Sequence, residues 1–192
     1  MSGLTSQPNL SAIAAALAGT ERDPGLSQDA LHATAMYWEG VRRFYSPFEA
    51  DIRSGTADVY RHEMPGGQYT NLREQARSMG LAHRWTEVSQ AYADVNQLFG
   101  DIVKVTPTSK VVGDMALMLV SGDMTTADVL DPAREVAFPA SVVSLFKGEL
   151  GFPPDGFPAE VSRKVLKLGA GESPPEPYRP GDRLPAVDLA AA

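Results

Sequence analysis

The N-terminal stretch "SGLTSQP" carries the side chains best suited to proton transfer. It holds the hydroxyls of Ser2, Thr5 and Ser6 beside the amide of Gln7, and a proline follows. A positioned hydroxyl can donate one proton while it accepts another, so it can serve as an acid–base group next to a bound carbonyl compound. The alternative is a loop that only leads into a helix, and composition alone favours that alternative.

A second candidate is the adjacent pair His62 and Glu63 in the stretch "HEMPGGQ". A histidine and a carboxylate can form an acid–base pair. Successive side chains on an extended segment point to opposite faces, so we expect these two not to share a substrate. Pro65, Gly66 and Gly67 instead predict a sharp strand-to-helix turn that needs a positive φ.

The stretch "VTPTSKVVGDMALML" is the third candidate. A helix that begins near Thr108, Ser109 and Lys110 could hold an anion through its free backbone N–H groups. The alternative is a structural helix, capped by Thr108 or Ser109, in which Gly113 allows close packing. The stretch lacks the glycine pattern of a phosphate-binding loop, and this favours the structural alternative.

Composition and charge exclude several classes of function. The formal charge of −7 and the pI of about 4.9 argue against nucleic acid or an anionic membrane as the main partner. The sequence has no cysteine, and its three histidines lack metal-site spacing. Because no apolar run has the length of a membrane span and no signal-peptide pattern occurs, we expect a cytoplasmic protein without a membrane segment.

The elements that must position these residues are mostly helices. Hydrophobic residues recur at spacings of three and four, which predicts a mainly α fold with one or two short strands. Segments 57–65 and 101–105 are the candidates for a strand or an extended link. From residue 169 on, the chain is rich in proline and glycine, as is typical of a linker or strap. The expected helices cover residues 10–19, 27–45, 69–78, 82–99, 108–120, 125–131, 139–150 and 158–169.

Local signals also predict how these helices begin and what they bury. Asn9 or Ser11 is expected to cap the first helix, and Ser27 the second. The helix at 82–99 is expected to bury a face that repeats with helical spacing. Four aromatic side chains at core spacing are interpreted as packing residues: Tyr37, Trp38, Trp85 and Tyr92.

Several long stretches, in order, are similar to one known family. "MSGLTSQP", "YWEGVRRFYSPFE", "YRHEMPGGQYTNLREQARSMGL" and "YADVNQLFGDIVKVTPTSKVVGDMALMLV" resemble the carboxyltransferase domain of the pyruvate carboxylase family of biotin enzymes. The resemblance extends from residue 1 to about 167. Alpha subunits of oxaloacetate decarboxylase and the 5S subunit of transcarboxylase share part of it and remain alternatives. Gln68 and Tyr69 after the double glycine, together with "GDIVKVTP", favour the carboxylase.

The resemblance implies a fold and a division of the chain. The family's domain is a TIM-type barrel followed by a helical extension that forms a funnel over the barrel mouth. This chain resembles only the loop after the last barrel strand and that extension. Residues 1–8 then form the active-site loop, residues 9–168 the helical funnel domain, and residues 169–192 the linker or strap.

The resemblance also implies the chemistry. Thr5 matches the threonine proposed to pass a proton between biotin and the pyruvate enolate, and Ser6 and Gln7 border the biotin or substrate pocket. Pyruvate and carboxybiotin are the implied substrates. The implied cofactors are biotin on a separate domain, a divalent metal such as Zn or Mn in the barrel portion, and ATP at another domain. A homotetramer with biotin carboxylase and biotinyl domains is implied for the whole enzyme.

The family's metal-ligand motifs have no match in this sequence, so the isolated chain is expected to be inactive. An alternative hypothesis is that the chain is not an enzyme but a helical module that binds barrel or partner subunits. It predicts a large exposed apolar face where the barrel would pack.

Overall fold

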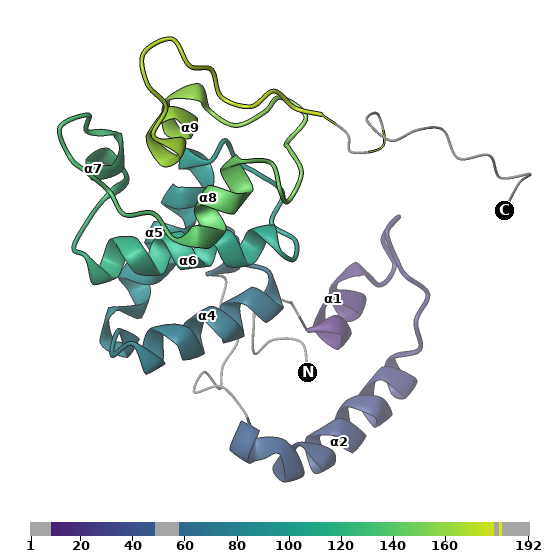
Figure 1. The fold of residues 1–192 in the computed structure, drawn as a ribbon. Helices are drawn as coiled ribbons and strands as arrows, with labels where there is room; N and C mark the ends of the chain where they lie inside the picture. The colour runs from purple at the N-terminus through teal and green to yellow at the C-terminus, as the bar shows by residue number, and fades with distance from the viewer. Residues whose placement is uncertain (1–8, 49–57, 179–180, 182–192) are drawn as a thin grey trace, which may run out of the picture. The chain divides into compact units, whose positions relative to one another are not determined.

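The computed structural model describes residues 9–48, 58–178 and 181. Over these residues all regular structure is helical, without a strand, so the predicted mainly α class is confirmed. The chain divides into two compact units, residues 1–82 and 83–192 (Figure 1). The predicted boundaries at residues 8 and 168 remain predictions. Residues 169–178, at the start of the expected strap, contain no helix or strand.

The helices are short and separated by loops. The first unit contains α1 (Leu10–Leu17), α2 (Gln28–Tyr45), the 3-10 turn η1 (Ser46–Phe48), α3 (Val59–His62) and α4 (Gly66–Ser78). A second 3-10 turn, η2 (Ala82–Arg84), leads into the second unit. That unit contains α5 (Trp85–Leu98), α6 (Thr108–Ser121), α7 (Thr126–Leu130), α8 (Ala140–Phe146) and α9 (Ala159–Leu166).

The second unit is built around α6. This helix packs against α5 and α8, and α9 packs against α7 and α8 (Figure 1). A helix that is apolar on all sides is typical of a buried central element. Nine residues of α6 are buried: Ser109, Val111, Val112, Gly113, Met115, Ala116, Leu117, Leu119 and Val120.

The predicted inner face of α5 is confirmed. Val88, Tyr92, Val95 and Phe99 are each 0% exposed, at spacings of three and four residues. Burial raises the pKa of the Tyr92 hydroxyl because the charged form would lose its solvation. Trp85 is half-buried. The packing prediction therefore holds fully for Tyr92 and in part for Trp85.

The first two helices begin at the predicted caps. The Asn9 Oδ1 atom accepts a hydrogen bond from the Ala12 N–H at 3.1 Å, and the Ser27 Oγ atom accepts one from the Ala30 N–H at 3.2 Å. Each bond satisfies a backbone donor that the first helical turn cannot pair internally. These starts depend only on neighbouring residues, and sequence rules located them correctly.

The packing prediction for α2 is wrong over the described residues. Tyr37 is 64% exposed and Trp38 is 49% exposed, and no residue of α2 is buried. The helix contacts α1 and η1. The apolar spacing was identified correctly, but no described element covers that side of the helix.

The strand or extended segment predicted over residues 57–65 is also wrong in the described part, because α3 occupies Val59–His62. Gly66 and Gly67 do not form a positive-φ turn and are instead the first residues of α4, which therefore begins three residues earlier than expected. The positive φ, 55°, belongs to Glu63 just after α3. Pro65 has φ −58° and no N–H, which suits the position before a first helical turn.

The start of α6 corrects a third prediction. Pro107 occupies the cap position, and Thr108 is the first residue inside the helix. The Thr108 hydroxyl lies 2.7 Å from the carbonyl oxygens of Val103 and Val105, and it accepts a hydrogen bond from the Val105 N–H at 3.2 Å. The side chain thus binds the preceding segment rather than the helix that follows. Residues 101–105 contain no strand, so of the two predictions for this segment the link applies.

Candidate functional site

The site residues predicted from the N-terminal stretch, Thr5, Ser6 and Gln7, lie outside the described residues. The described part begins at Asn9, two positions after Gln7, and Asn9 caps α1. The roles of the three residues stay predictions.

His62 is a buried structural residue at the end of α3. Its side chain is 4% exposed, and its Nδ1 atom accepts a hydrogen bond from the Met64 N–H at 2.9 Å. The imidazole lies against the Tyr69 ring, with 5.2 Å between the ring centres. Burial lowers the pKa of His62, and the negative charge of Asp58 opposes this shift in part. These contacts favour the structural interpretation of "HEMPGGQ" over an acid–base pair.

The lowered pKa of His62 predicts how stability depends on pH. The unfolded chain binds a proton at this histidine near pH 6.5, whereas the folded chain binds it only at lower pH. Stability should therefore fall as the pH drops from about 6.5 toward the folded-state pKa. His62→Asn keeps an acceptor for the Met64 N–H and removes the titrating group. We expect it to flatten the pH profile of urea unfolding between pH 7 and about 5.

His32→Asn is the matched control because His32 is exposed on α2. A loss of slope in this control as large as that in His62→Asn would contradict the assignment to His62.

The side chains at the start of α6 are engaged within the protein. The Lys110 Nζ atom donates to both carboxylate oxygens of Asp114, at 2.7 and 2.9 Å, and the Ser141 hydroxyl donates to the same carboxylate at 2.7 Å. Ser109 is buried. The arrangement joins the start of α6 to α8 and favours the structural alternative over an anion site.

The Arg84 side chain forms a polar junction between two helices, and no sequence pattern predicted these contacts. Its guanidinium donates to the Glu87 carboxylate at 2.6 and 3.0 Å and to the Val120 carbonyl oxygen at 2.8 Å, and it pairs with Asp123 at 2.8 Å. Hydrogen bonding to Glu87 and then Asp123 raises the pKa of Arg84. The junction joins the start of α5 to the end of α6, whose last carbonyl oxygens lack helical partners.

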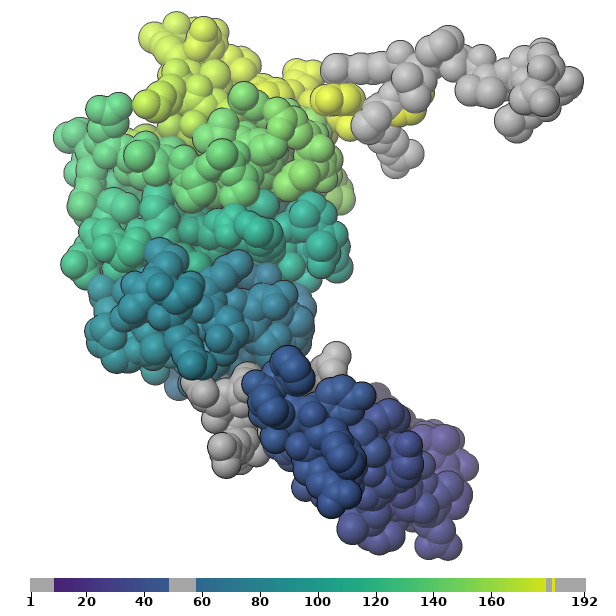
Figure 2. All heavy atoms as spheres, turned by 60° about the horizontal axis from the view of Figure 1, so that its bottom comes forward, coloured from purple at the N-terminus to yellow at the C-terminus, as the bar shows by residue number. Residues whose placement is uncertain are grey.

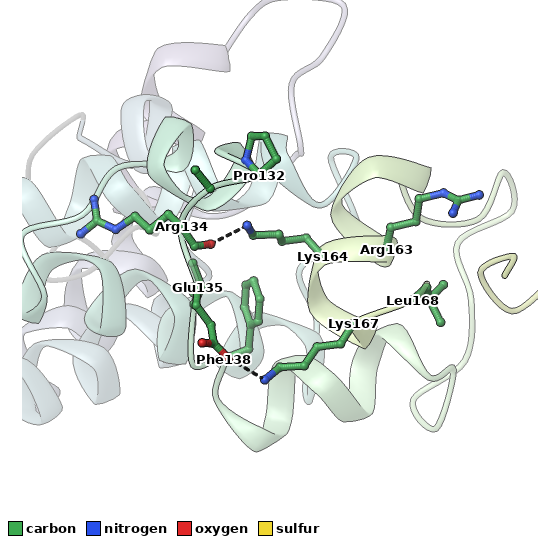
Figure 3. Close-up of a pocket in the computed structure, with 10 residues that line it drawn as sticks. Pro132, Arg134, Glu135, Phe138, Arg163, Lys164, Lys167 and Leu168 are labelled. Atoms are coloured by element: carbon green, nitrogen blue, oxygen red, sulfur yellow. Dashed lines mark hydrogen bonds and ion pairs between the residues drawn. The ribbon is translucent and has the colours of Figure 1, made fainter. Parts of the chain in front are cut away.

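An open groove of about 380 Å³ lies between α9 and segment 132–138 (Figure 3). The Lys164 Nζ atom donates to the carbonyl oxygens of Asp131 and Arg134, at 2.6 and 2.5 Å. Lys167 reaches Glu135 at 3.3 Å, whereas the Arg163 side chain points away from the groove (Figure 3). Lys164 therefore fastens a distant loop to α9, and Lys167 adds an exposed ion pair to the same loop. Basic residues near a helix C-terminus usually offset the helix dipole, so no pattern along the chain indicated this long-range role.

Lys164→Met tests whether the hydrogen bonds of Lys164 stabilise the fold more than an exposed surface charge does. The substitution removes two hydrogen bonds to main-chain carbonyls, and we expect it to lower the free energy of unfolding by about 1–3 kcal/mol. Lys167→Met is the matched control, because its ion pair joins side chains that are 69% and 88% exposed. Exposed pairs contribute about 0–1 kcal/mol. Equal urea midpoints for the two variants would contradict the fastening role.

The described residues contain no group of three or more His, Asp or Glu side chains placed to hold a metal ion. No helix among them is long and apolar enough to cross a membrane. The junctions around Arg84, Asp114 and Lys164 join elements to one another. In the part of the chain that the structure describes, the polar clusters thus have evident structural roles.

One protein family matches more than half of the chain. The chain belongs to the conserved carboxylase domain family, which matches residues 59–192. This confirms the resemblance found in the sequence and extends it to the proline-rich end.

Within that class the chain is similar to pyruvate carboxylases. Pyruvate carboxylase of Bacillus subtilis is 47% identical over 191 residues, which cover 100% of this chain and 16% of that protein. The mitochondrial pyruvate carboxylase of Homo sapiens is 45% identical over 193 residues, with the same coverage of 100% and 16%. The chain therefore spans about 16% of the length of the curated relatives that it matches.

Solved structures agree with this relation. The carboxyl transferase domain of Rhizobium etli pyruvate carboxylase, solved with pyruvate and biocytin, is 59% identical, with a TM-score of 0.79. The match covers 98% of this chain and 31% of that domain. The complete Rhizobium etli enzyme gives the same identity and TM-score, with 17% of its chain covered. The chain thus corresponds to part of a pyruvate carboxylase carboxyltransferase domain, and its described residues are helical.

Proposed function

We propose that this chain serves in a pyruvate carboxylase, where its domain transfers CO2 from carboxybiotin to pyruvate and yields oxaloacetate. The observation that carries the proposal is the 59% identity, over 98% of this chain, to a carboxyl transferase domain solved with pyruvate and biocytin. A similar fold alone would not assign a reaction, but identity at this level over nearly the whole chain supports a shared one.

Thr5 is the proposed proton carrier. Its hydroxyl oxygen accepts a proton from the pyruvate methyl group while its own proton passes to the ureido nitrogen of biotin. The bond between the ureido nitrogen and the carboxyl group of carboxybiotin breaks and frees CO2. The enolate carbon of pyruvate forms a bond to this CO2, which gives oxaloacetate. A hydroxyl suits this exchange because it gains one proton as it loses another and keeps its charge. Ser6 and Gln7 are proposed to border the biotin or substrate pocket.

The other parts of the reaction are proposed to lie outside this chain. The described residues contain no cluster that fits a divalent metal such as Zn or Mn, and such a metal is proposed to lie in the barrel portion of the domain. Biotin is proposed to arrive on a separate domain after ATP-dependent carboxylation elsewhere in the enzyme. A cytoplasmic homotetramer remains the proposed state of the whole enzyme, and the isolated chain is expected to be inactive.

The test is a steady-state assay of the full-length protein that contains this chain. We expect oxaloacetate to form only when ATP, bicarbonate, pyruvate and attached biotin are all present. ATP-independent decarboxylation of oxaloacetate would instead support the decarboxylase alternative. Absence of both reactions in a folded, biotinylated protein would support a non-catalytic helical module.

A further inference from the structure

The described part of the proline-rich strap, residues 169–178, lies against the second unit. These residues contain no helix or strand, yet the Tyr178 side chain at their end is only 36% exposed. In Figure 2 the yellow residues at the end of the second unit lie along its green part. A free linker would leave such a large side chain open to solvent, so part of the second unit covers Tyr178.

The Phe152 ring provides this cover. Its centre lies 5.6 Å from the centre of the Tyr178 ring, and the two ring planes are tilted by 57°. Phe152 also lies 5.9 Å from Phe157, whose ring lies 4.6 Å from that of the buried Phe146. Ring centres separated by about 4.5–7 Å attract one another. A row of rings therefore runs from the core of the second unit to the end of the strap.

Two glycines let this row and the strap approach the backbone closely. A Cβ atom at Gly148 would collide with the Phe152 ring. A Cβ atom at Gly156 would lie 3.3 Å from the Cγ atom of Pro177. Both glycines have a positive φ, 81° and 73°, which other residues rarely adopt. We call Gly148, Phe152 and Gly156 the strap site.

The strap has a composition that suits reversible docking. The stretch "SPPEP" directly precedes Tyr178 and contains three prolines. Each proline fixes φ at about −65°, so the segment is largely extended before it docks and loses little conformational entropy. Glu176 and Pro177 stay exposed, so the contact depends mainly on one ring and one proline. A contact of this size can open without unfolding the helices beneath it.

We propose that the strap site docks an extended proline–tyrosine segment, and that Pro177 and Tyr178 occupy it as a releasable latch. When the latch is closed, the chain beyond Tyr178 starts from a fixed point on the second unit. When it is open, residues 169–178 are free to extend by about 33–36 Å. The latch thus controls how far the following residues reach. This inference depends only on contacts within the second unit and goes beyond the proposed function.

Limited digestion with chymotrypsin tests the latch, because this protease must bind an aromatic ring in order to cut after it. The Tyr178 ring is not available while it lies on Phe152. In the full-length protein we expect the cut after Tyr178 to be about tenfold slower than in a free peptide with the sequence of residues 169–182. Mass spectrometry of the fragments identifies the cut.

Phe152→Ala should speed this cut about tenfold, because it removes the ring on which Tyr178 lies. Cuts within α6 should keep their wild-type rate. Phe152→Leu should also speed the cut after Tyr178, and it keeps most of the side-chain volume beside Gly148, which guards against a loss of fold. Leu150→Ala is the matched control, because Leu150 lies in the same loop and is 38% exposed.

Three outcomes would overturn the proposal. The first is a wild-type protein that is cut after Tyr178 as fast as the free peptide, because the ring would then be undocked. The second is an unchanged rate in both Phe152 variants, since Phe152 would then not hold the strap. The third is an equal acceleration by Leu150→Ala, which would attribute the effect to general loosening of the loop.

Discussion

Thr5→Ala in the full-length enzyme is expected to lower oxaloacetate formation by about 10²–10⁴-fold, the usual contribution of a positioned acid–base group. The methyl group of alanine can neither accept the proton from pyruvate nor donate one to biotin. The ATP-dependent carboxylation of biotin takes place at another domain under this proposal, so its rate should not change. The measurements are the overall rate and the rate of this half-reaction on the same preparation.

Thr5→Ser is the control for the hydroxyl. Serine keeps the group that carries the proton and loses only a methyl group, so we expect it to retain most of the rate. Near-normal oxaloacetate formation by Thr5→Ala would refute the assigned role. An equal loss in both variants would attribute the effect to packing of the threonine methyl group.

Phe146→Ala should have the largest effect on stability, lowering the free energy of unfolding by about 3–5 kcal/mol. Phe146 is 1% exposed at the end of α8. Its ring lies edge to face with Phe99, 5.0 Å between centres, and against Phe157 at 4.6 Å. Truncation would remove both ring contacts and leave a cavity between α8 and the end of α5. Urea unfolding followed by circular dichroism measures the effect.

Phe48→Ala is the matched control in the 192-residue chain. Phe48 is 85% exposed, so the same substitution should change stability by no more than about 0.5 kcal/mol. A loss for Phe48→Ala comparable to that for Phe146→Ala would show that the first unit covers this ring in solution.

Features that depend on near neighbours in the sequence were predictable. Asn9 and Ser27 cap their helices as the side-chain rules require. The buried face of α5 follows from its 3.6-residue period. Such features are decided within one or two helical turns, so a short window of sequence contains the information.

Three of the errors concern where helices begin or end. Val59 and Tyr60 favour a strand, yet they lie in α3. Two glycines after Pro65 suggested a positive-φ turn, but the positive φ belongs to Glu63. The Thr108 hydroxyl binds the segment before α6, because the chain at residues 103–105 places carbonyl oxygens within its reach.

The candidate site was predictable only through similarity. The hydroxyls of "SGLTSQP" by themselves were compatible with a plain loop, and the role of Thr5 came from the family that the longer stretches resemble. Side-chain chemistry in one short loop does not define a substrate, because catalysis needs the groups that other parts of a domain bring near.

By itself the sequence determined the helical class, most helix positions and the family, since these depend on short-range periodicity and on matches in order along the chain. Only the tertiary structure showed that Lys164 binds carbonyl oxygens 30 and 33 positions away. It also showed that Tyr92 and Trp38, both at core spacing, differ completely in exposure. The spacing of residues defines which side of a helix is apolar, whereas burial depends on whether another element covers that side.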